Sequence, residues 1–251
     1  MNRFIIISFL AALFFSCKPN PQSITIAAAS DLQYALDDIK AEFIKENPEI
    51  KVNIIYGSSG NLYQQLVNKA PFNLYFSADI LYPNKLDSLK LSATKPKLYA
   101  TGFLVVWTSK LDTTQGYNLL RSNEVLNLAI ANPRHAPYGK RAVEFLKFYN
   151  LYEQVEEKLV EGENISQTAQ FVLSGNAEVG IIALSLALSP TMQNAGKYIL
   201  IDEKSHSAIE QAYIIVKGSE TKPEVIRFYE FVDTELARTI FSKYGFRLPK
   251  D

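Results

Sequence analysis

Short apolar runs of strand length alternate with amphipathic helical segments along most of this 251-residue chain. The run from Ile24 to Ala29 reads as a buried strand, and residues 32–46 then carry apolar side chains at helical spacing. Further strands are predicted at 52–56, 74–76, 101–108, 128–131, 179–184 and 211–217, and further helices at 62–68, 80–90, 140–149, 165–173 and 222–243. This alternation predicts an α/β fold with parallel, doubly wound sheets and a ligand at the carboxyl ends of the strands.

The first seventeen residues differ from the rest of the chain. Arg3 supplies one positive charge, residues 4–15 are almost entirely apolar, and Cys17, the only cysteine, comes directly after them and Ser16. An apolar run this short is typical of a secretory signal and not of a permanent membrane span. Residues 13–17 also resemble a bacterial lipobox, in which the cysteine is lipidated and becomes the mature N-terminus. We therefore expect a lipoprotein signal peptide at 1–17.

A short polar, proline-containing tether is predicted at 18–23, between the lipidated Cys17 and the first strand. The protein is therefore expected to be exported and lipid-anchored at the cell envelope, facing the periplasm. The chain carries 26 basic and 26 acidic side chains, which are well mixed along its length. That balance gives no electrostatic reason to expect nucleic acid as a partner. No cluster of Cys and His has metal-ligand spacing, so no protein-bound metal is expected.

The turns before four of the predicted helices are rich in small and polar residues. Ser30 is followed three residues later by Gln33, an N-capping arrangement, and Asn164 is followed by Gln167 in the same way. Glycine and serine make up most of the turn at 57–61, and the turn at 132–139 leads into another helix. Helix N-termini carry unpaired N–H groups and a partial positive charge, so several at one cleft can hold an anion. Serine and asparagine are also ordinary caps, so these starts are compatible with capping alone.

At three of these turns, and at three further segments, the chain resembles the molybdate-binding proteins of bacterial ABC importers. The segments are AAAS at 27–30, GSSGNL at 57–62, LYFSAD at 74–79, ANPRHAPYG at 131–139, VGIIALS at 179–185 and YGF at 244–246. Each segment is short, but their order and spacing together extend over nearly all of residues 24–246.

The resemblance implies a two-lobed periplasmic-binding-protein fold of the second type, with the anion held in the cleft between the lobes. Lobe I then comprises 22–100 and 209–251, lobe II comprises 101–208, and strands near 101–108 and 209–217 cross between them. The implied ligand is molybdate or tungstate, with no other cofactor. The implied partner is an ABC-importer permease, and the protein is expected to act as a monomer without enzymatic activity.

The resemblance also implies which residues contact the anion. Ser30 and Ser59 match two family serines that offer hydroxyl and backbone donors. Tyr138 and Ile165 match positions that offer backbone N–H groups, so the Tyr138 side chain is not expected to matter. Asp31 is expected to contribute its N–H group, with its carboxylate turned away because a negative charge facing the anion opposes binding.

Two positions depart from the family pattern. Some members carry a tyrosine that contacts the anion where this chain has Ala183, and Ser185 is a candidate to supply that contact instead. Asn73 replaces an aspartate that is common before the third strand, and we interpret it as structural.

Other functions remain open from the residues alone. A serine hydrolase has only His135 and His206 to use as its base, and the sequence at 57–60 is not a G-x-S-x-G elbow. A binding protein for another small anion or an organic solute is the other alternative. Arg134 and Lys140 are the nearest basic residues that can hold a carboxylate.

Overall fold

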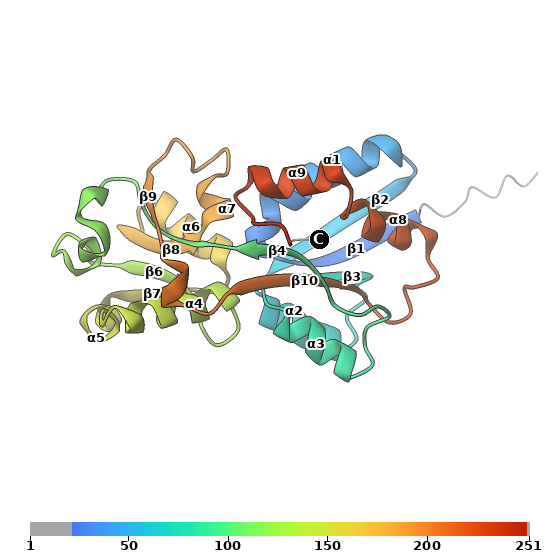
Figure 1. The fold of residues 1–251 in the computed structure, drawn as a ribbon, viewed down its shortest axis with the longest axis horizontal. Coiled ribbons are helices and arrows are strands. Elements are labelled where there is room, and N and C mark those ends of the chain that lie inside the picture. Colours follow the sequence, from blue (N-terminus) through green and yellow to red (C-terminus); the bar gives the residue numbers. More distant parts are fainter. Residues whose placement is uncertain (1–21, 250–251) are drawn as a thin grey trace, which may run out of the picture.

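The computed structural model describes residues 22–249. The predicted signal peptide, Cys17 and residues 18–21 of the predicted tether lie outside this range. The described chain forms two five-stranded sheets, which lie side by side along the long axis of the molecule (Figure 1). None of the helices within 22–249 has the length and apolar character that a membrane span requires.

Each sheet is built largely from one part of the chain. The first has the order β2-β1-β3-β10-β4 and comprises β1 (Gln22–Ala29), β2 (Ile50–Gly57), β3 (Leu74–Ser77), β4 (Lys97–Gly102) and β10 (Ile209–Ile215). The second has the order β7-β6-β8-β5-β9 and comprises β5 (Leu104–Thr108), β6 (Leu128–Ala131), β7 (Leu159–Gly162), β8 (Val179–Ala183) and β9 (Lys197–Leu200).

Helices cover both faces of each sheet (Figure 1). Around the first sheet lie α1 (Gln33–Glu46), α8 (Pro223–Phe231) and α9 (Glu235–Lys243) on one face and α2 (Ser59–Val67) and α3 (Leu81–Ser88) on the other. Around the second lie α4 (Pro137–Phe148), α5 (Tyr152–Val155), α6 (Ile165–Leu173) and α7 (Leu184–Ala187). Short 3-10 turns occur at Ser30–Leu32, Thr113–Arg121, Glu156–Lys158 and Glu203–Ser205.

The central strand β1 shows why the first sheet is buried on both faces. Successive side chains of a strand point to opposite faces. Ile24, Ile26 and Ala28 accordingly belong to the main core, whereas Ala27 belongs to a smaller core with residues of α2 and α3. All four are fully buried. The uninterrupted apolar run in the sequence therefore reflects a strand covered on both sides.

The predicted α/β fold with doubly wound, mostly parallel sheets is confirmed, and each sheet has one reversed strand. In the first sheet β1 pairs in parallel with β2 and β3, while β10 is antiparallel to β3 and β4. In the second, β6 pairs in parallel with β7 and β8, while β5 is antiparallel to β8 and β9. The reversed strand is in each case the one that the chain enters from the other sheet.

Some element boundaries differ from those predicted. The predicted strand at 101–108 is interrupted at Phe103, where the chain passes from β4 to β5 and from one sheet to the other. The chain returns through residues 201–208, which precede β10. Strand β1 begins at Gln22, so residues 22 and 23 pair with β2 and are not part of a tether. Helices α2 and α4 begin three residues earlier than predicted, because Ser58 caps the first and Pro137 opens the second.

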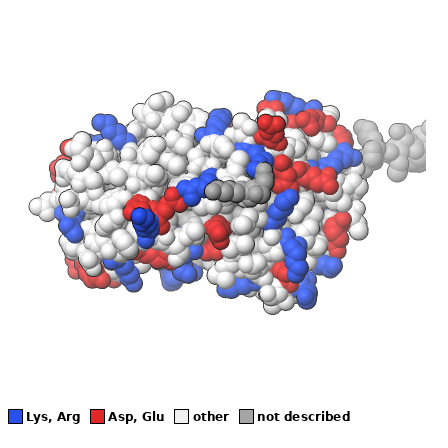
Figure 2. Space-filling view, in the orientation of Figure 1, with Lys and Arg blue, Asp and Glu red and all other residues white. Residues whose placement is uncertain are grey.

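Charges on the surface are mixed. On the face shown in Figure 2, basic and acidic side chains lie interspersed, and neither sign covers a whole half of the molecule. Basic and acidic side chains, which are equal in number in the sequence, are therefore also mixed on this face.

Candidate functional site

The five predicted site residues line one small pocket between the two sheets. Ser30, Asp31, Ser59, Tyr138 and Ile165 are joined there by small and apolar neighbours, namely Ala29, Gly57, Ser58, Ala78, Ala136 and Pro137. The cavity has a volume of about 10 Å³, whereas clefts for organic ligands enclose about 300 Å³ or more. No lysine, arginine or histidine belongs to the lining. The pocket therefore suits a compact group that neutral donors can hold.

The pocket lies where strands of both sheets end and the next helices begin. Ser30 and Asp31 follow β1, and Ser59 is the first residue of α2, directly after the turn that leaves β2. Tyr138 lies in the first turn of α4, and Ile165 is the first residue of α6. N–H groups in the first turn of a helix have no acceptor within the helix. The fold thus brings residues of four chain segments, three of them at the starts of α2, α4 and α6, to one place.

Ser59 is held so that its hydroxyl hydrogen remains available. The Ala78 N–H group donates to Ser59 Oγ at 3.0 Å, and the Tyr75 hydroxyl donates to the Ser59 carbonyl oxygen at 2.7 Å. Ser59 is completely buried. Because its oxygen already accepts a hydrogen bond from Ala78, the hydroxyl group can serve a ligand as a donor.

Ser30 joins the end of β1 to the start of α6. Its hydroxyl donates to Asn164 Oδ1 at 3.1 Å and accepts from the Ser166 N–H group at 3.4 Å. The Ser166 hydroxyl donates in turn to the Ser30 carbonyl oxygen at 2.8 Å. An anion that takes the Ser30 hydroxyl hydrogen has to compete with the Asn164 side chain for it.

Asp31 anchors a buried polar network beneath the pocket. Its Oδ2 accepts hydrogen bonds from the Tyr138 hydroxyl at 3.0 Å and from Gln211 Nε2 at 2.7 Å. The Tyr99 hydroxyl donates to Gln211 Oε1 at 2.5 Å. Desolvation raises the pKa of Asp31 from 3.8 to about 6, although the hydrogen bonds from Gln211 and Tyr138 oppose the shift. The carboxylate is thus hydrogen-bonded through Oδ2 to Tyr138 of the lining and to Gln211, which does not line the pocket.

Two members of this network have contacts that the sequence does not predict. The Tyr138 side chain need not contact the anion, but its hydroxyl donates to Asp31 and accepts from Gln211 at 3.1 Å. Gln211 was not predicted as a functional residue at all. Its one signal in the sequence is that a polar residue stands at the start of an otherwise apolar predicted strand. In the structure the Gln211 side chain is completely buried.

Three contacts join the two halves of the molecule, each half being built around one of the two sheets. The Gly60 N–H group donates to the His135 carbonyl oxygen at 2.9 Å, and Ser58 Oγ shares a hydrogen bond of 2.9 Å with His135 Nδ1. Arg141 also reaches across to Asp79, with 3.3 Å between Nη2 and Oδ2. These contacts hold segments that follow β2 and β3 against segments that follow β6.

Ser58 and His135 are the residue types of a hydrolase nucleophile and base, but the described residues provide no carboxylate to orient the histidine. Within 22–249 no carboxylate forms a hydrogen bond with the His135 ring, so the ring has no orienting third group. Ser58 also caps α2 by accepting from the Asn61 N–H group. His206 Nδ1 is hydrogen-bonded to the Ser207 carbonyl oxygen. The geometry of the pair is that of a contact between the two halves.

Ala183, which stands where some family members have a tyrosine, and Ser185, the candidate to replace that contact, do not line the pocket. Ala183 ends β8 and is completely buried. The Ser185 hydroxyl donates to the Asp31 carbonyl oxygen at 2.8 Å, and Ser185 is not among the lining residues. Its hydroxyl hydrogen is therefore already used, and Ser185 holds Asp31 in place instead of contacting the space for a ligand.

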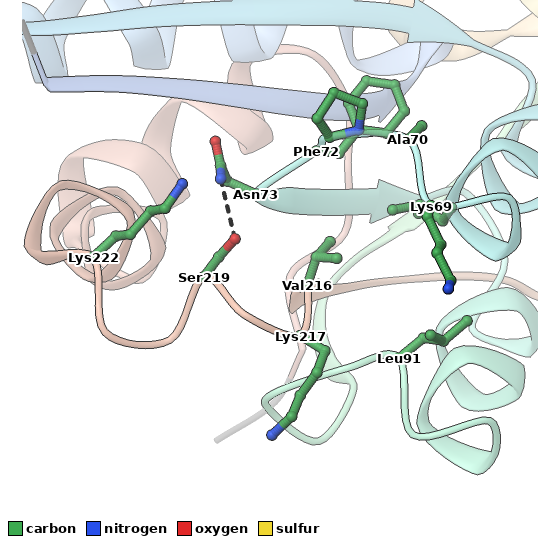
Figure 3. A pocket seen from close by; sticks show the side chains of 11 residues that line it. Lys69, Ala70, Phe72, Asn73, Leu91, Val216, Lys217, Ser219 and Lys222 are labelled. Atoms are coloured by element: carbon green, nitrogen blue, oxygen red, sulfur yellow. Dashed lines mark hydrogen bonds between the residues drawn. The ribbon is translucent and has the colours of Figure 1, made fainter.

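A larger cavity of about 440 Å³ lies at the opposite end of β3 (Figure 3). The amino groups of Lys69, Lys217 and Lys222 lie at three separate places around it and do not converge. Asn73 accepts from the Thr25 N–H group at 2.8 Å and donates to Ser219 Oγ at 3.0 Å. Its bonds to β1 and to the segment after β10 are structural. The smaller pocket is the stronger candidate site, because residues from four chain segments meet at it.

No group of three or more His, Cys, Asp or Glu side chains in the described part of the chain is placed to hold a metal ion.

Comparison with known proteins gives a consistent picture. The family model of bacterial extracellular solute-binding proteins matches residues 24–247. The molybdate-binding protein of Azotobacter vinelandii is 31% identical over 241 residues, which cover 95% of each chain. A putative ABC transporter substrate-binding lipoprotein of Bacillus subtilis is 30% identical and is matched over 89% of this chain and 86% of its own.

Solved structures share the fold. The periplasmic molybdate-binding protein of A. vinelandii superposes with a TM-score of 0.85 at 29% identity, over 90% of this chain and 100% of that one. A sulfate-binding protein of Mycobacterium tuberculosis has a TM-score of 0.75 at 14% identity, over 90% of this chain and 87% of its own. At that identity the likeness is one of fold alone.

Proposed function

This chain belongs to the family of bacterial extracellular solute-binding proteins, and from that premise we propose that it binds a tetrahedral oxyanion for an ABC importer. The proposed ligand is molybdate, with tungstate as a close analogue, bound in the pocket between the two sheets. The observation that carries the proposal is that donors from four chain segments meet at one small pocket whose lining has no basic side chain.

The chemistry of the pocket supports a fully deprotonated anion. Helix N-termini supply N–H groups and partial positive charge, and the Ser59 hydroxyl adds a further donor. A protonated oxyanion such as hydrogen phosphate needs an acceptor as well. Asp31 is the only carboxylate of the lining, and its Oδ2 already accepts hydrogen bonds from Tyr138 and Gln211. The proteins compared above that bind molybdate by name support the same ligand.

We propose that binding closes two lobes, one of residues 22–100 and 209–251 and the other of residues 101–208. The chain crosses between the two sheets at Phe103 and through residues 201–208, which makes these segments the proposed hinge. Closure brings the helix starts of α4 and α6 onto those of the first lobe. The protein then acts as a monomeric carrier that presents its anion to a permease, without catalysis.

Replacing Ser59 or Ser30 with alanine is expected to weaken molybdate binding by ~1–3 kcal/mol each, because a buried anion oxygen loses one donor. Isothermal titration calorimetry measures the effect. Ser174→Ala is the matched control, since its exposed hydroxyl bonds only to the Phe171 carbonyl oxygen. If both site variants bind as tightly as this control, the pocket has been assigned wrongly.

Export and lipid anchoring at Cys17 belong to the same proposal. The signal-like residues 1–17 support it, as does the B. subtilis relative, which is described as a lipoprotein. Cys17→Ser is expected to move the protein from the membrane fraction to the soluble periplasmic fraction after cell fractionation. A Cys17→Ser protein that stays with the membranes and is released only by detergent contradicts lipidation at this residue.

Two alternatives are less well supported by the site. A binding protein for an organic carboxylate would use a basic residue to hold it, and Arg134 and Lys140 do not belong to the lining of the pocket. Hydrolysis needs a base with an orienting partner, which the His135 ring lacks among the described residues. Another small oxyanion is the closest competitor, and direct titration distinguishes it.

A further inference from the structure

Asp31 is a buried acid in a pocket that we propose for an anion. It is the only acidic residue of the lining and is 2% exposed. Oδ2 accepts hydrogen bonds from Tyr138 and Gln211, whereas Oδ1 is buried and has no hydrogen-bond partner. One oxygen of the carboxylate is thus fully engaged and the other is free to carry a proton.

The backbone of Asp31 connects its carboxylate to the ligand site. The Asp31 N–H group is one of the donors that we propose for the oxyanion, and the carboxyl group belongs to the same residue of the lining. An anion bound to this N–H group therefore places a like charge beside the carboxylate. A nearby like charge favours the neutral carboxyl group, because it raises the pKa of an acid.

No basic side chain offsets this repulsion. The titratable groups that face the carboxyl group are the hydroxyls of Tyr138 from α4 and Tyr99 from β4, and burial holds the pKa of each well above its ordinary value. Neither tyrosine supplies a positive charge in any form.

The charged residues on the surrounding elements have other partners or lie on the surface. Arg141 of α4 pairs with Asp79 and Glu144, and Lys97 of β4 pairs with Asp233. On α1, Asp38 bonds Lys243 and Asp37 bonds Tyr56, and Glu210 of β10 is exposed. Helices α6 and α7 carry no charged residue.

We propose that Asp31 takes up one proton from the solvent when the oxyanion binds, so that the site binds the dianion together with a proton on Oδ1. This inference rests on the proposed oxyanion function and deepens it. The proton goes to Oδ1 because Oδ2 already accepts two hydrogen bonds. The complex then holds a dianion beside a neutral carboxyl group, and one negative charge of the site is removed.

Proton uptake makes the affinity depend on pH. At pH values where the free site is ionised and the complex is protonated, the dissociation constant rises up to about tenfold for each pH unit, by linkage. Because burial raises the pKa of Asp31 to about 6 in the free site, this regime begins above that pH. Below it Asp31 already carries its proton, and the affinity becomes independent of pH.

Calorimetry of the full chain with molybdate tests the proposal at pH about 8, in two buffers that differ in ionisation enthalpy. The difference between the two measured heats gives the number of protons taken up. The wild-type protein is expected to take up close to one proton for each anion. Asp31→Asn keeps the backbone donor but has no acid, so it is expected to take up none. Asp37→Asn, an exposed acid on α1, is the matched control and is expected to behave like the wild type.

The outcomes separate the two proposals. Molybdate binding without proton uptake by the wild type overturns the inference and leaves the oxyanion function standing. The same follows if Asp31→Asn takes up as many protons as the wild type. A purely structural role of Asp31 shifts the dissociation constant equally at every pH and does not change the proton count. Failure to bind molybdate at any pH overturns the proposed function and this inference with it. The wild-type proton count decides the question even if Asp31→Asn does not fold.

Discussion

Gly60→Ala is expected to weaken molybdate binding by about 100-fold or more while leaving the protein folded. A Cβ atom at this position would lie 2.6 Å from the His135 carbonyl oxygen and 2.9 Å from the His135 Cα atom. Both atoms are backbone of the opposite half, so no single side chain can move aside. The halves must separate, and the donors of α4 and α6 then leave the pocket. A 100-fold loss corresponds to about 2.7 kcal/mol.

Gly218→Ala, outside the lining of the pocket, is the control. A Cβ atom there would meet nothing within 4 Å, although the φ of +88° strains any residue other than glycine. Calorimetry and thermal unfolding are measured on both variants. We expect Gly218→Ala to bind close to wild type and both variants to unfold cooperatively. If Gly60→Ala binds as tightly as Gly218→Ala, then contact between the halves is not required for binding.

Gln211→Leu is expected to lower the free energy of unfolding by about 3–5 kcal/mol at pH 8, because it leaves a buried charge short of a donor. Gln211 Nε2 donates to Asp31 Oδ2, and Gln211 Oε1 accepts from Tyr99. All of these groups are buried, so water does not replace the lost bonds. Gln65→Leu, on the exposed side of α2, is the control and is expected to change stability little. Denaturant unfolding measures both.

The cost of Gln211→Leu should depend on pH. The pKa of Asp31 is raised in the folded protein, so this group favours the folded state below its unfolded value of 3.8, and the contribution is lost as the pH rises through about 6. The hydrogen bond from Gln211 lowers that pKa, so removing it raises the pKa further. The destabilisation is therefore expected to be larger at pH 8 than at pH 5. Adding Asp31→Asn to Gln211→Leu should abolish the difference, and an equal cost at both pH values contradicts an ionised Asp31.

Much of the fold and the outline of the pocket follow from local sequence. Ser30 stands at the boundary between a predicted strand and a predicted helix, and Ile165 at the start of a predicted helix, where small polar residues interrupt the apolar pattern. The parallel arrangement of the strands then brings such boundaries to one edge of each sheet. The resemblance to molybdate-binding proteins identified the particular residues at these turns, and the structure gathers all five in one pocket.

The polar network beneath the pocket had no comparable local signal. Asp31 and Gln211 are 180 residues apart, and Tyr138 lies 107 residues from Asp31. Their hydrogen bonds depend on how the two sheets are placed, and each residue alone fits an ordinary cap or strand. The same reason explains why Tyr138 was expected to contribute only its backbone.

Two short strands, β7 and β9, are not predicted from the sequence. Strands β7 and β9 have four residues each, and their side chains are mostly partly buried or exposed. They therefore lack both the apolar run of a central strand and a clear alternation. The break at Phe103 was missed because residues 101–108 form one β-prone stretch, and only the tertiary structure divides it between two sheets.

Isothermal titration of the protein with molybdate, tungstate, sulfate and phosphate in turn tests the central claim most directly. We predict tight one-to-one binding of molybdate and tungstate and no heat of binding with sulfate or phosphate. Silence from all four anions, with the protein folded, would contradict the oxyanion function and move the ligand to another class of solute.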